Sequence, residues 1–372
     1  MTRQTVAHVD LDAIRSNFRV LVDFLAASPG GSPDVIAVVK ANAYGHGAPQ
    51  VATALEDAGA AMLACADIEE GIVLRQAGVR VPILVFGALS VSDLDGIFTH
   101  DLTPTISTPG AALALEAAAA GRGVRLRCHL KIDTGMNRLG FRHDNIGRTL
   151  PAVAASRHLE IAAVYTHFAT ADSPDHPAFV LQRERFEAVL ARLPSLGIRV
   201  PLRHAANSAA LLRDERIWFD FVRPGLLLYG IVPPPLAATI PLRPALSLRS
   251  RIVAVKGIRP GEGSGYGLGS VFDQPVTLAV VPAGYADGLD LRLTGRGYML
   301  VRGRRAPIVG SVCMDMTMID VTGTDVVPGD EVVIVGEQEA ESIGVREIAA
   351  AIGSIPYELL CRVGSRIERV YD

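Results

Sequence analysis

The chain has 372 residues, of which 49% are hydrophobic and 20% are charged, a composition typical of a globular protein and not of a disordered chain. The formal net charge is -3, from 36 basic and 39 acidic residues, so no excess of positive charge favours nucleic acid as a partner. No stretch of 18 or more apolar residues occurs, and the sequence therefore predicts no membrane-spanning helix.

The N-terminus, MTRQTVAHVDLDAIRSNF, passes directly into strand-like and helix-like patterns, so we expect no secretory signal peptide. The cysteines form no CxxC pair and have no zinc-ligand spacing, which predicts free thiols in a cytoplasmic protein without a metal site. These cysteines are Cys65, Cys128, Cys313 and Cys361.

Short apolar segments alternate with helical patterns from the start of the chain. VAHV precedes LDAIRSNFRVLVDFLAA, VIAVV precedes PQVATALEDAG, and MLACA precedes DIEEGIVLRQAG. The series continues with PILVFG, LTPTIS, RLRCHLKID, LEIAAVYTHF, LRHAAN and DFVRPG. Continuous apolar strands separated by amphipathic helices are typical of a parallel sheet covered on both faces. About eight such units predict a (β/α)8 TIM barrel, with an open doubly wound sheet as the alternative. Nine candidate strands are present, so we expect one to lie outside the barrel.

The pattern changes at residues 233–244, PPPLAATIPLRP, whose five prolines predict a linker. Beyond the linker, SLRSRIVAVKGI, VTLAVVPAGYA, GYMLVRGRRAPIVG, MTMIDVT and EVVIVG are β-like runs joined by glycine-containing turns. One helical stretch, VREIAAAIG, interrupts them. The sequence therefore predicts an α/β barrel over residues 1–240 and a mostly antiparallel β domain over residues 241–372.

Polar side chains stand where several predicted barrel strands end. In a (β/α)8 barrel, the carboxyl ends of the strands surround the mouth that holds the active site. Five strand ends of mixed charge on one face are more than the fold requires, which predicts a functional site. The residues at these ends are Lys40, Lys131, Asp133, Arg138, His167, His204, Asn207, Ser208 and Arg223.

Lys40, which ends VIAVV, has two interpretations. A lysine at this position can simply extend its amine to water. Alternatively, burial and neighbouring cations keep the amine partly neutral, so that it forms a Schiff base with a carbonyl such as pyridoxal phosphate. That cofactor also needs a phosphate site and a partner for its ring nitrogen. Candidates for the phosphate site are NSAALL, which contains Ser208, and the turn RPGL, although such turns are common. Arg223 is a candidate partner for the ring nitrogen, although a structural ion pair explains this arginine better when it is considered alone.

Eight motifs occur in a fixed order: VVKANAYGHG, KIDTGMNRLG, THFATAD, HAANSAALL, RPGLLLYG, GSGYG, VPAGYADG and SVCMD. Together with the closing IPYELLCRVGSRIERVY, they make the chain resemble the alanine racemases over essentially its full length. The resemblance implies a fold type III enzyme with pyridoxal 5'-phosphate that interconverts L- and D-alanine and supplies D-alanine for bacterial peptidoglycan. It also implies a homodimer with shared active sites.

The resemblance assigns the cofactor contacts. It implies that Lys40 holds the cofactor as an internal aldimine and later acts as one catalytic base. Arg223 would face the pyridine nitrogen with His204 behind it, and His167 would lie beside the ring. Because an arginine does not readily give up a proton, the ring nitrogen would stay unprotonated and the cofactor would be a weaker electron sink. The implied phosphate contacts are Tyr44, Ser208, Gly225, Leu226 and Tyr357.

The resemblance implies that Tyr266, in GSGYG, is the second base. It also implies that this tyrosine comes from the β domain of the other subunit. Racemisation removes a proton from one face of Cα and delivers one to the opposite face, which two groups achieve more simply than one. Without the resemblance, an aromatic residue in a flexible glycine-rich turn is the preferred interpretation of Tyr266.

The resemblance also assigns the substrate contacts. Arg138 and the backbone of Met314 would hold the substrate carboxylate, for which the planar guanidinium is suited. Lys131 would carry a carbamate that supports Arg138. Tyr285 would narrow the entrance. Asp172 and Arg292 would line the corridor outside it.

Three other functions fit parts of the sequence. A racemase for serine or a larger amino acid would use the same machinery. Single-domain barrels that bind pyridoxal phosphate in cofactor homeostasis lack the β domain, which residues 245–372 disfavour. A decarboxylase of similar layout would pair the ring nitrogen with an acidic residue in place of Arg223. The sequence contains no HExxH, GxSxG or P-loop motif, which disfavours those chemistries.

Overall fold

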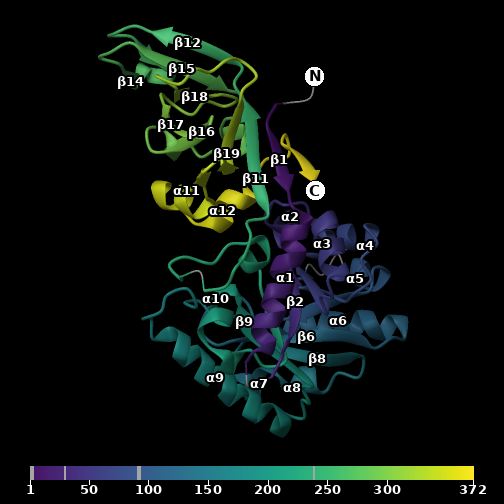
Figure 1. Ribbon diagram of the computed structural model, residues 1–372. Helices are drawn as coiled ribbons and strands as arrows, with labels where there is room; N and C mark the ends of the chain where they lie inside the picture. Colours follow the sequence, from purple (N-terminus) through teal and green to yellow (C-terminus); the bar gives the residue numbers. More distant parts are fainter. Residues whose placement is uncertain (1–3, 29–30, 90–93, 238) are drawn as a thin grey trace. The chain divides into compact units, whose positions relative to one another are not determined.

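The structure is a computed structural model that describes residues 4–28, 31–89, 94–237 and 239–372 (Figure 1). The chain forms two compact units, which are treated separately below. The barrel unit comprises Ile14–Ala43 and Ala48–Leu242. The β unit comprises Met1–Ala13, Tyr44–Gly47 and Arg243–Asp372.

Within the described residues, eight parallel strands of the barrel unit form a closed sheet. In sheet order they are β5 (Leu102–Ile106), β4 (Ile83–Val85), β3 (Met62–Cys65), β2 (Asp34–Val38), β10 (Phe221–Arg223), β9 (Leu202–Asn207), β8 (Leu159–Tyr165) and β6 (Leu126–Asp133). Pairing of β5 with β6 closes the ring, and the short β7 (Phe141–Arg142) extends it beside β6. This confirms the predicted (β/α)8 barrel and excludes the open sheet.

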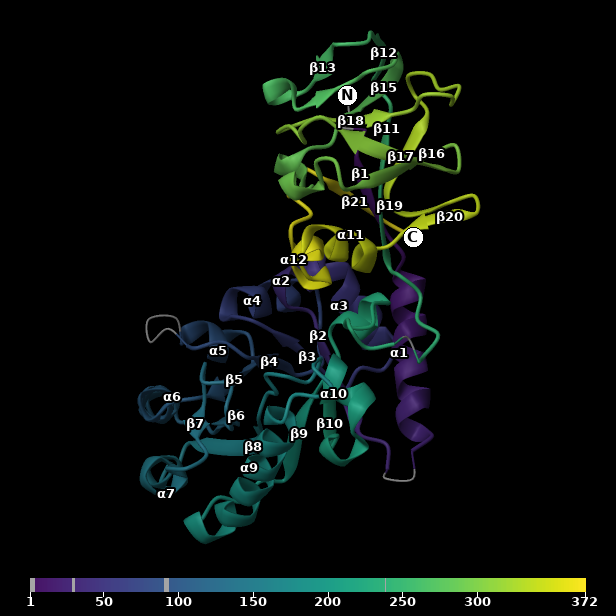
Figure 2. The same cartoon turned by 90° about the vertical axis from the view of Figure 1, so that its left-hand side faces the viewer.

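The helices of the barrel unit lie outside its strands (Figures 1 and 2). They are α1 (Leu11–Ala26), which follows β1, and α3 (Ala48–Asp57), α4 (Ile68–Gln76), α5 (Asp95–Thr99), α6 (Pro109–Arg122), α7 (Ile146–Thr149), α8 (Pro151–Ala154), α9 (Ala178–Arg192) and α10 (Ser208–Arg213). Local signals fix their ends. Thr108 caps α6 by accepting a hydrogen bond from the Ala111 amide, and Gly123, at φ 64°, ends the same helix.

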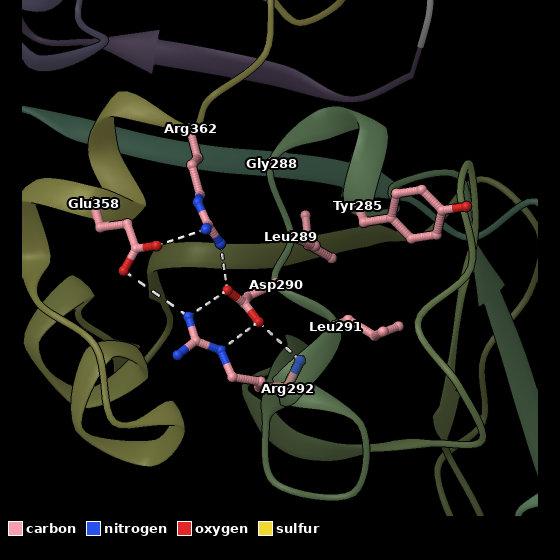
Figure 3. Close-up of a pocket in the computed structure, with 8 residues that line it drawn as sticks. All are labelled: Tyr285, Gly288, Leu289, Asp290, Leu291, Arg292, Glu358 and Arg362. Carbon is pink, nitrogen blue, oxygen red and sulfur yellow. Dashed lines mark hydrogen bonds and ion pairs between the residues drawn. The ribbon is translucent and has the colours of Figure 1, made fainter.

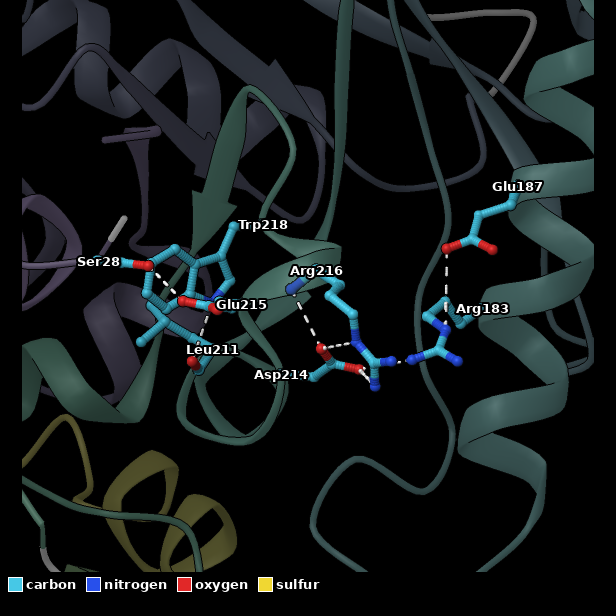
Figure 4. Close-up of polar contacts among 8 residues, drawn as sticks. All are labelled: Ser28, Arg183, Glu187, Leu211, Asp214, Glu215, Arg216 and Trp218. Atoms are coloured by element: carbon cyan, nitrogen blue, oxygen red, sulfur yellow. Dashed lines mark hydrogen bonds and ion pairs between the residues drawn. The ribbon is translucent and has the colours of Figure 1, made fainter. Parts of the chain in front are cut away.

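Polar contacts fix the segment between α10 and β10 (Figure 4). The carboxylate of Asp214 accepts a hydrogen bond from Nη1 of Arg183, on α9, at 2.8 Å. Trp218 Nε1 donates to the carbonyl of Leu211 at 2.9 Å. Because these bonds hold the segment that leads into β10, they help to position Arg223 at the end of that strand.

The β unit contains a mostly antiparallel sheet. Its order is β12 (Ala254–Ile258), β15 (Val276–Val281), β18 (Thr317–Asp320), β17 (Arg304–Val309), β16 (Tyr298–Val301), β19 (Glu331–Gln338), β11 (Leu246–Arg251), β1 (Val6–Val9) and β21 (Glu368–Tyr371), with β20 (Glu341–Ile343) beside β19. The hairpin of β13 (Gly263–Ser264) and β14 (Ser270–Val271) and the helices α11 (Val345–Ile352) and α12 (Pro356–Cys361) complete the unit. The predicted β domain is thereby confirmed as a fold.

The first strand, β1, belongs to the β unit. It pairs antiparallel with β11 and parallel with β21. The compact units therefore differ from the predicted division, which placed all of residues 1–240 in the barrel, and β1 is the candidate strand expected outside it. No helix in the described part of the chain combines the length and hydrophobicity needed to cross a lipid bilayer. The four cysteines are free thiols.

Candidate active site

The predicted site residues of the barrel unit lie at or just beyond the carboxyl ends of its strands. Lys40 follows β2, and the end of that strand is joined to the segment after β10. Val38 donates its amide proton to the Pro224 carbonyl at 3.1 Å, and its own carbonyl accepts from the Tyr229 hydroxyl at 3.0 Å. These bonds hold the start of the Lys40 turn beside the turn that contains Gly225.

A chain of hydrogen bonds runs from Arg223 into the barrel core. Arg223 is only 3% exposed, and its Nη1 lies 2.7 Å from Nδ1 of His204. Nε2 of His204 lies 3.0 Å from Nδ1 of His129. Because a guanidinium only donates, Nδ1 of His204 accepts, so the His204 proton resides on Nε2 and is donated to His129. The direction of the chain is thereby fixed from Arg223 through His204 to His129.

The other terminal nitrogen of Arg223 is also held by the protein. Nη2 donates to the carbonyls of Thr166 at 2.8 Å and Ala205 at 3.0 Å, and lies 3.4 Å from Nδ1 of His167. Burial lowers the pKa of Arg223 to about 10, so the side chain stays cationic at neutral pH. Among the residues that the structure describes, Nε makes no hydrogen bond, so it remains as a donor for a ligand.

Tyr165 forms a platform under these groups. Its ring stacks on that of His204 with centroids 4.6 Å apart, and its hydroxyl lies 3.0 Å from Oγ1 of Thr105. The Lys131 amine and the Arg223 guanidinium lie 5.5 Å and 5.2 Å from the ring centroid, within range of cation–π attraction. Burial raises the pKa of Tyr165 to about 12, so the ring stays neutral while it holds both cations.

Cations converge at this end of the barrel. Burial lowers the pKa of Lys131 to about 8, and the neighbouring charges of Arg138, Arg223 and Lys40 contribute in the same direction. The pKa of His167 lies well below its ordinary value, first because of burial and then because of the same cations together with Lys131. The neutral imidazole of His167 is therefore surrounded by positive charge, which suits an anionic ligand.

Ser208 and Gly225 meet at the start of a helix. The amide of Gly225 donates to Oγ of Ser208 at 2.8 Å, and Ser208 is the first residue of α10. Asn207 caps this helix by accepting from the Ala210 amide at 2.9 Å. Leu226 opens the next short helix, η4 (Leu226–Tyr229). Among the residues that the structure describes, none accepts the Ser208 hydroxyl proton, so it remains for an anion placed at these two helix starts.

Asp172 is exposed in the loop after β8. Arg213, the last residue of α10, holds this loop by donating to the carbonyls of Thr170 at 3.0 Å and Ala171 at 2.9 Å. Its guanidinium also lies 4.1 Å from the centroid of the Phe179 ring. Arg213 therefore joins the loop that carries Asp172 to the helix that begins at Ser208.

Tyr44 and Tyr357 lie together in the β unit. Their ring centroids are 6.0 Å apart, and Tyr44 is buried. The neighbouring backbone leaves no room for a side chain, because a Cβ at Gly45 would lie 2.1 Å from the carbonyl oxygen of Leu360. Arg369 donates from Nε to the Gly45 carbonyl at 2.7 Å. Residues 44–47 are thus fixed against α12, the helix that carries Tyr357.

Tyr285 and Met314 lie on adjacent backbone segments of the β unit. The Tyr285 amide donates to the Cys313 carbonyl at 2.9 Å, and the Ala286 amide donates to the Met314 carbonyl at 3.1 Å. A Cβ at Gly284 would lie 2.2 Å from the Cys313 carbonyl oxygen, so glycine is required for this approach. About half of the Tyr285 and Met314 side-chain surfaces are exposed, so both can face a ligand.

Arg292 lines a cavity of about 640 Å³ in the β unit (Figure 3). The buried carboxylate of Asp290 accepts from Nε and Nη2 of Arg292 at 2.9 and 2.7 Å and also pairs with Arg362. The hydrogen bonds from Arg292 hold the pKa of Asp290 below its ordinary range. Glu358 pairs with Arg362 and so joins the cluster to α12, while the Tyr285 ring points away from the two arginines.

Tyr266 projects from the β unit into solvent. It lies in the turn between β13 and β14 and is 80% exposed. The neighbouring side chains of Leu268 and Val271 are also mostly exposed. The backbone of the turn is anchored, since the Tyr266 carbonyl accepts from Oγ of Ser311 at 3.1 Å. The phenol is therefore presented on a fixed backbone beside an apolar surface.

Comparison with known proteins identifies the family. The model of the alanine racemase N-terminal domain matches residues 9–233, and that of the alanine racemase C-terminal domain matches residues 245–371. The chain belongs to the alanine racemase family. It is 41% identical to an alanine racemase of Halothermothrix orenii, covering 100% of this chain and 97% of that protein. It is 42% identical to an alanine racemase of Symbiobacterium thermophilum, covering 99% of this chain and 97% of that protein.

Solved structures of alanine racemases have the same fold. The enzyme of the D-cycloserine producer Streptomyces lavendulae matches with a TM-score of 0.95 and 36% identity, covering 100% of this chain and 98% of that one. The enzyme of Bartonella henselae, solved with covalently bound pyridoxal phosphate, matches with a TM-score of 0.88 and 27% identity, covering 99% of each chain.

The sequence analysis did not single out His129, Tyr165 or Asp290 in this alanine racemase family member. The first two carry a detectable signal, because residues two apart on a strand share a face. His129 precedes Lys131 by two positions, and Tyr165 precedes His167 by two. Asp290 has one partner nearby in the sequence, Arg292, but its second partner, Arg362, comes from a distant segment that the local sequence does not indicate.

The lowered pKa values of His129, His167 and His204 predict acid sensitivity. Burial lowers the pKa of His129 to about 3, and those of His167 and His204 lie well below their ordinary value. Below about pH 6.5 the unfolded chain binds protons at these sites and the folded chain does not, so stability falls as pH falls. Each histidine should lower the free energy of unfolding by about 1.4 kcal/mol per pH unit well below 6.5.

Urea unfolding at pH 7, 6 and 5, followed by the fluorescence of Trp218, the single tryptophan, measures this slope. His129→Asn should reduce the slope, because it removes one of the contributing groups. His176→Asn, at an exposed position, is the matched control. A slope that is equal in both variants would contradict the prediction.

Proposed function

We propose that this chain interconverts L- and D-alanine with pyridoxal 5'-phosphate as cofactor, and that it supplies D-alanine for bacterial peptidoglycan from the cytoplasm. The observation that carries the proposal is the convergence of Lys40, Lys131, Arg138 and Arg223 around the neutral His167, in a chain that belongs to the alanine racemase family. This set of cations suits both a phosphate-bearing cofactor and a substrate carboxylate.

The residues present fit the cofactor. Lys40 would hold it covalently. The Ser208 hydroxyl, oriented by the Gly225 amide, and the Leu226 amide would bind its phosphate, helped by the hydroxyls of Tyr44 and Tyr357. When bound, pyridoxal phosphate makes the α-proton of an attached amino acid more acidic by accepting electron density from Cα. The free Nε donor of Arg223 would face the ring nitrogen.

Arg223 would keep its proton in this position. Nη1 is fixed by His204 and Nη2 by two backbone carbonyls, so the guanidinium plane is preorganised. With a pKa of about 10, the side chain donates a hydrogen bond at neutral pH without transferring its proton. The ring nitrogen would then stay neutral, which favours brief proton exchange over reactions that need a longer-lived carbanion.

Lys40 and Tyr266 would act as the two bases on opposite faces of Cα. We propose that the Tyr266 phenol enters the barrel mouth of a second copy of the chain, so that the enzyme is a homodimer with shared active sites. The high exposure of Tyr266, Leu268 and Val271 supports this, because burial of such a surface against another copy would be favourable.

Substrate selection would depend on Arg138, Lys131 and Met314. Arg138 would bind the substrate carboxylate with two parallel hydrogen bonds, and the Met314 amide would complete its binding. The Lys131 amine, with a pKa of about 8, has a neutral fraction that can add carbon dioxide and lose a proton. The resulting negative carbamate would support Arg138, whereas the ammonium form would repel it.

The entrance to the site would be lined by exposed side chains. Tyr285 would narrow it and so favour a methyl side chain over larger ones. Asp172 and Arg292 would line the corridor outside it. The ion pair with Asp290 would hold Arg292 in place there.

Purified protein supplied with pyridoxal phosphate is expected to convert L-alanine into an equal mixture of L- and D-alanine, since enantiomers have equal free energies. Chiral chromatography of the products measures this. L-serine and L-leucine, tested in parallel, should racemise more slowly. Faster turnover of serine would favour the serine racemase alternative, and the absence of D-alanine would contradict the proposal.

A further inference from the structure

The backbone that follows Lys40 is a left-handed turn built without glycine. Ala41, Asn42 and Ala43 have φ of 52°, 52° and 53° with ψ of 53°, 47° and 50°, and φ of Tyr44 is also 52°. This conformation brings Cβ close to the next carbonyl oxygen and costs roughly 1–2 kcal/mol per residue for L-amino acids. The turn therefore requires contacts that hold it in place.

Glu70 supplies one of these contacts. Its Oε1 accepts a hydrogen bond from the Ala41 amide, the first after Lys40, at 2.6 Å. Its Oε2 accepts from the Ala66 amide, directly after β3, at 2.8 Å. Glu70 is itself fixed in the first turn of α4, where Asp67 accepts from its amide at 2.9 Å. One carboxylate thus ties the Lys40 turn to the neighbouring strand end.

A second contact holds the exit of the turn. Oδ1 of Asn42 accepts from the Ala48 amide at 2.8 Å, and the Ala43 amide donates to the Val39 carbonyl at 2.8 Å. The bond from Ala43 to Val39 spans residues 40–42 and holds the turn as a whole, whereas the Ala41 amide itself donates to Glu70. Because that amide belongs to the peptide between Lys40 and Ala41, Glu70 acts directly on the peptide that follows Lys40.

We propose that Glu70 is a positioning residue for Lys40, holding the strained turn that aims the lysine amine at the carbonyl of pyridoxal phosphate. This inference rests on the proposed function. The negative charge of Glu70 matters for this role, because both of its carboxylate oxygens accept hydrogen bonds from backbone N–H donors. A glutamine of the same shape would place an N–H group against one of these donors and leave that amide unsatisfied.

The test is spectroscopic titration of the cofactor-free protein with pyridoxal phosphate, followed by the visible absorbance of the lysine-bound cofactor. Glu70→Gln should weaken binding about 10- to 100-fold. Glu69→Gln changes the exposed neighbour on the same helix and should leave binding within about twofold of the unchanged chain. Equal affinities of these two variants would overturn the inference.

Adding Ala41→Gly to Glu70→Gln tests the role of the turn. Glycine adopts positive φ without the Cβ penalty, so the double variant should recover about two- to fivefold of the lost affinity. No recovery would overturn the link between Glu70 and the strained turn. If Glu70 had only a general structural role, Glu70→Gln would lower the thermal midpoint, but the folded fraction would keep its affinity for pyridoxal phosphate. That result would also overturn the inference.

If Glu70→Gln does not fold, Glu70→Asp takes its place. Aspartate keeps the charge but is one methylene shorter, so it can reach only one of the two amides and should weaken binding about tenfold. Affinity equal to that of Glu69→Gln would again overturn the inference. Failure of the proposed function is distinguishable, because the unchanged chain would then form no lysine-bound cofactor.

Discussion

Replacing Lys40 by alanine is expected to abolish both the visible absorbance of the cofactor-loaded protein and the racemisation of alanine. The amine is the group that would bind the cofactor covalently and the group that would move the proton on one face of Cα. Loss of a catalytic base alone slows a reaction by about 10²- to 10⁴-fold, and loss of the covalent link adds to this. Absorbance spectra and chiral product analysis measure the two effects separately.

The scarcity of lysine makes this experiment specific. The chain contains only Lys40, Lys131 and Lys256. Lys256→Ala, at an exposed position on β12, is the matched control and should keep both absorbance and turnover. If Lys40→Ala retained either property while Lys256→Ala matched the unchanged chain, the assignment of Lys40 would be wrong.

Tyr266→Phe is expected to keep the cofactor and lose racemisation by about 10²- to 10⁴-fold in both directions, because a single phenol oxygen is removed from the proton path. The two directions must slow together, since the equilibrium constant between enantiomers is one. Exchange of the α-proton with solvent separates the faces. It should persist for the enantiomer that Lys40 deprotonates and nearly vanish for the other.

Deuterium exchange into L- and D-alanine, followed by mass spectrometry, measures this asymmetry. Tyr298→Phe changes another exposed tyrosine of the β unit, on β16, and should behave like the unchanged chain. Equal residual exchange of the two enantiomers in Tyr266→Phe would count against two bases on opposite faces.

The barrel could be predicted from the sequence because its strands are buried on both faces. Nearly all consecutive residues of β2, β3 and β4 are buried, so these strands are recognisable in the sequence as apolar runs. β1 differs, because its residues alternate between partly buried and buried, as in a sheet with one covered face. VAHV is too short to display that difference clearly, so its sheet could not be assigned. The helix α12 was not distinguished because it has only six residues and begins at Pro356.

Candidate site residues at strand ends could be predicted from the geometry of a parallel barrel, which brings the carboxyl ends of all strands to one mouth. The residues that support them could not. His129 has a signal in its spacing from Lys131, but the contacts of Glu70 and His129 are not predictable, because their partners Ala41 and His204 are distant in sequence. Such bonds depend on the register between strands and on side-chain rotamers, which no local pattern encodes.

The arrangement of the shared site can be tested by mixing two inactive variants. In a heterodimer of Lys40→Ala and Tyr266→Phe chains, one site would combine the intact Lys40 of one chain with the intact Tyr266 of the other. If equal amounts of the two variants re-associate at random into two-fold symmetric dimers, half of the dimers are mixed. Each mixed dimer has one intact site out of two. We therefore expect about a quarter of full activity. Activity of the mixture no greater than that of the separate variants would contradict a phenol contributed by the partner chain.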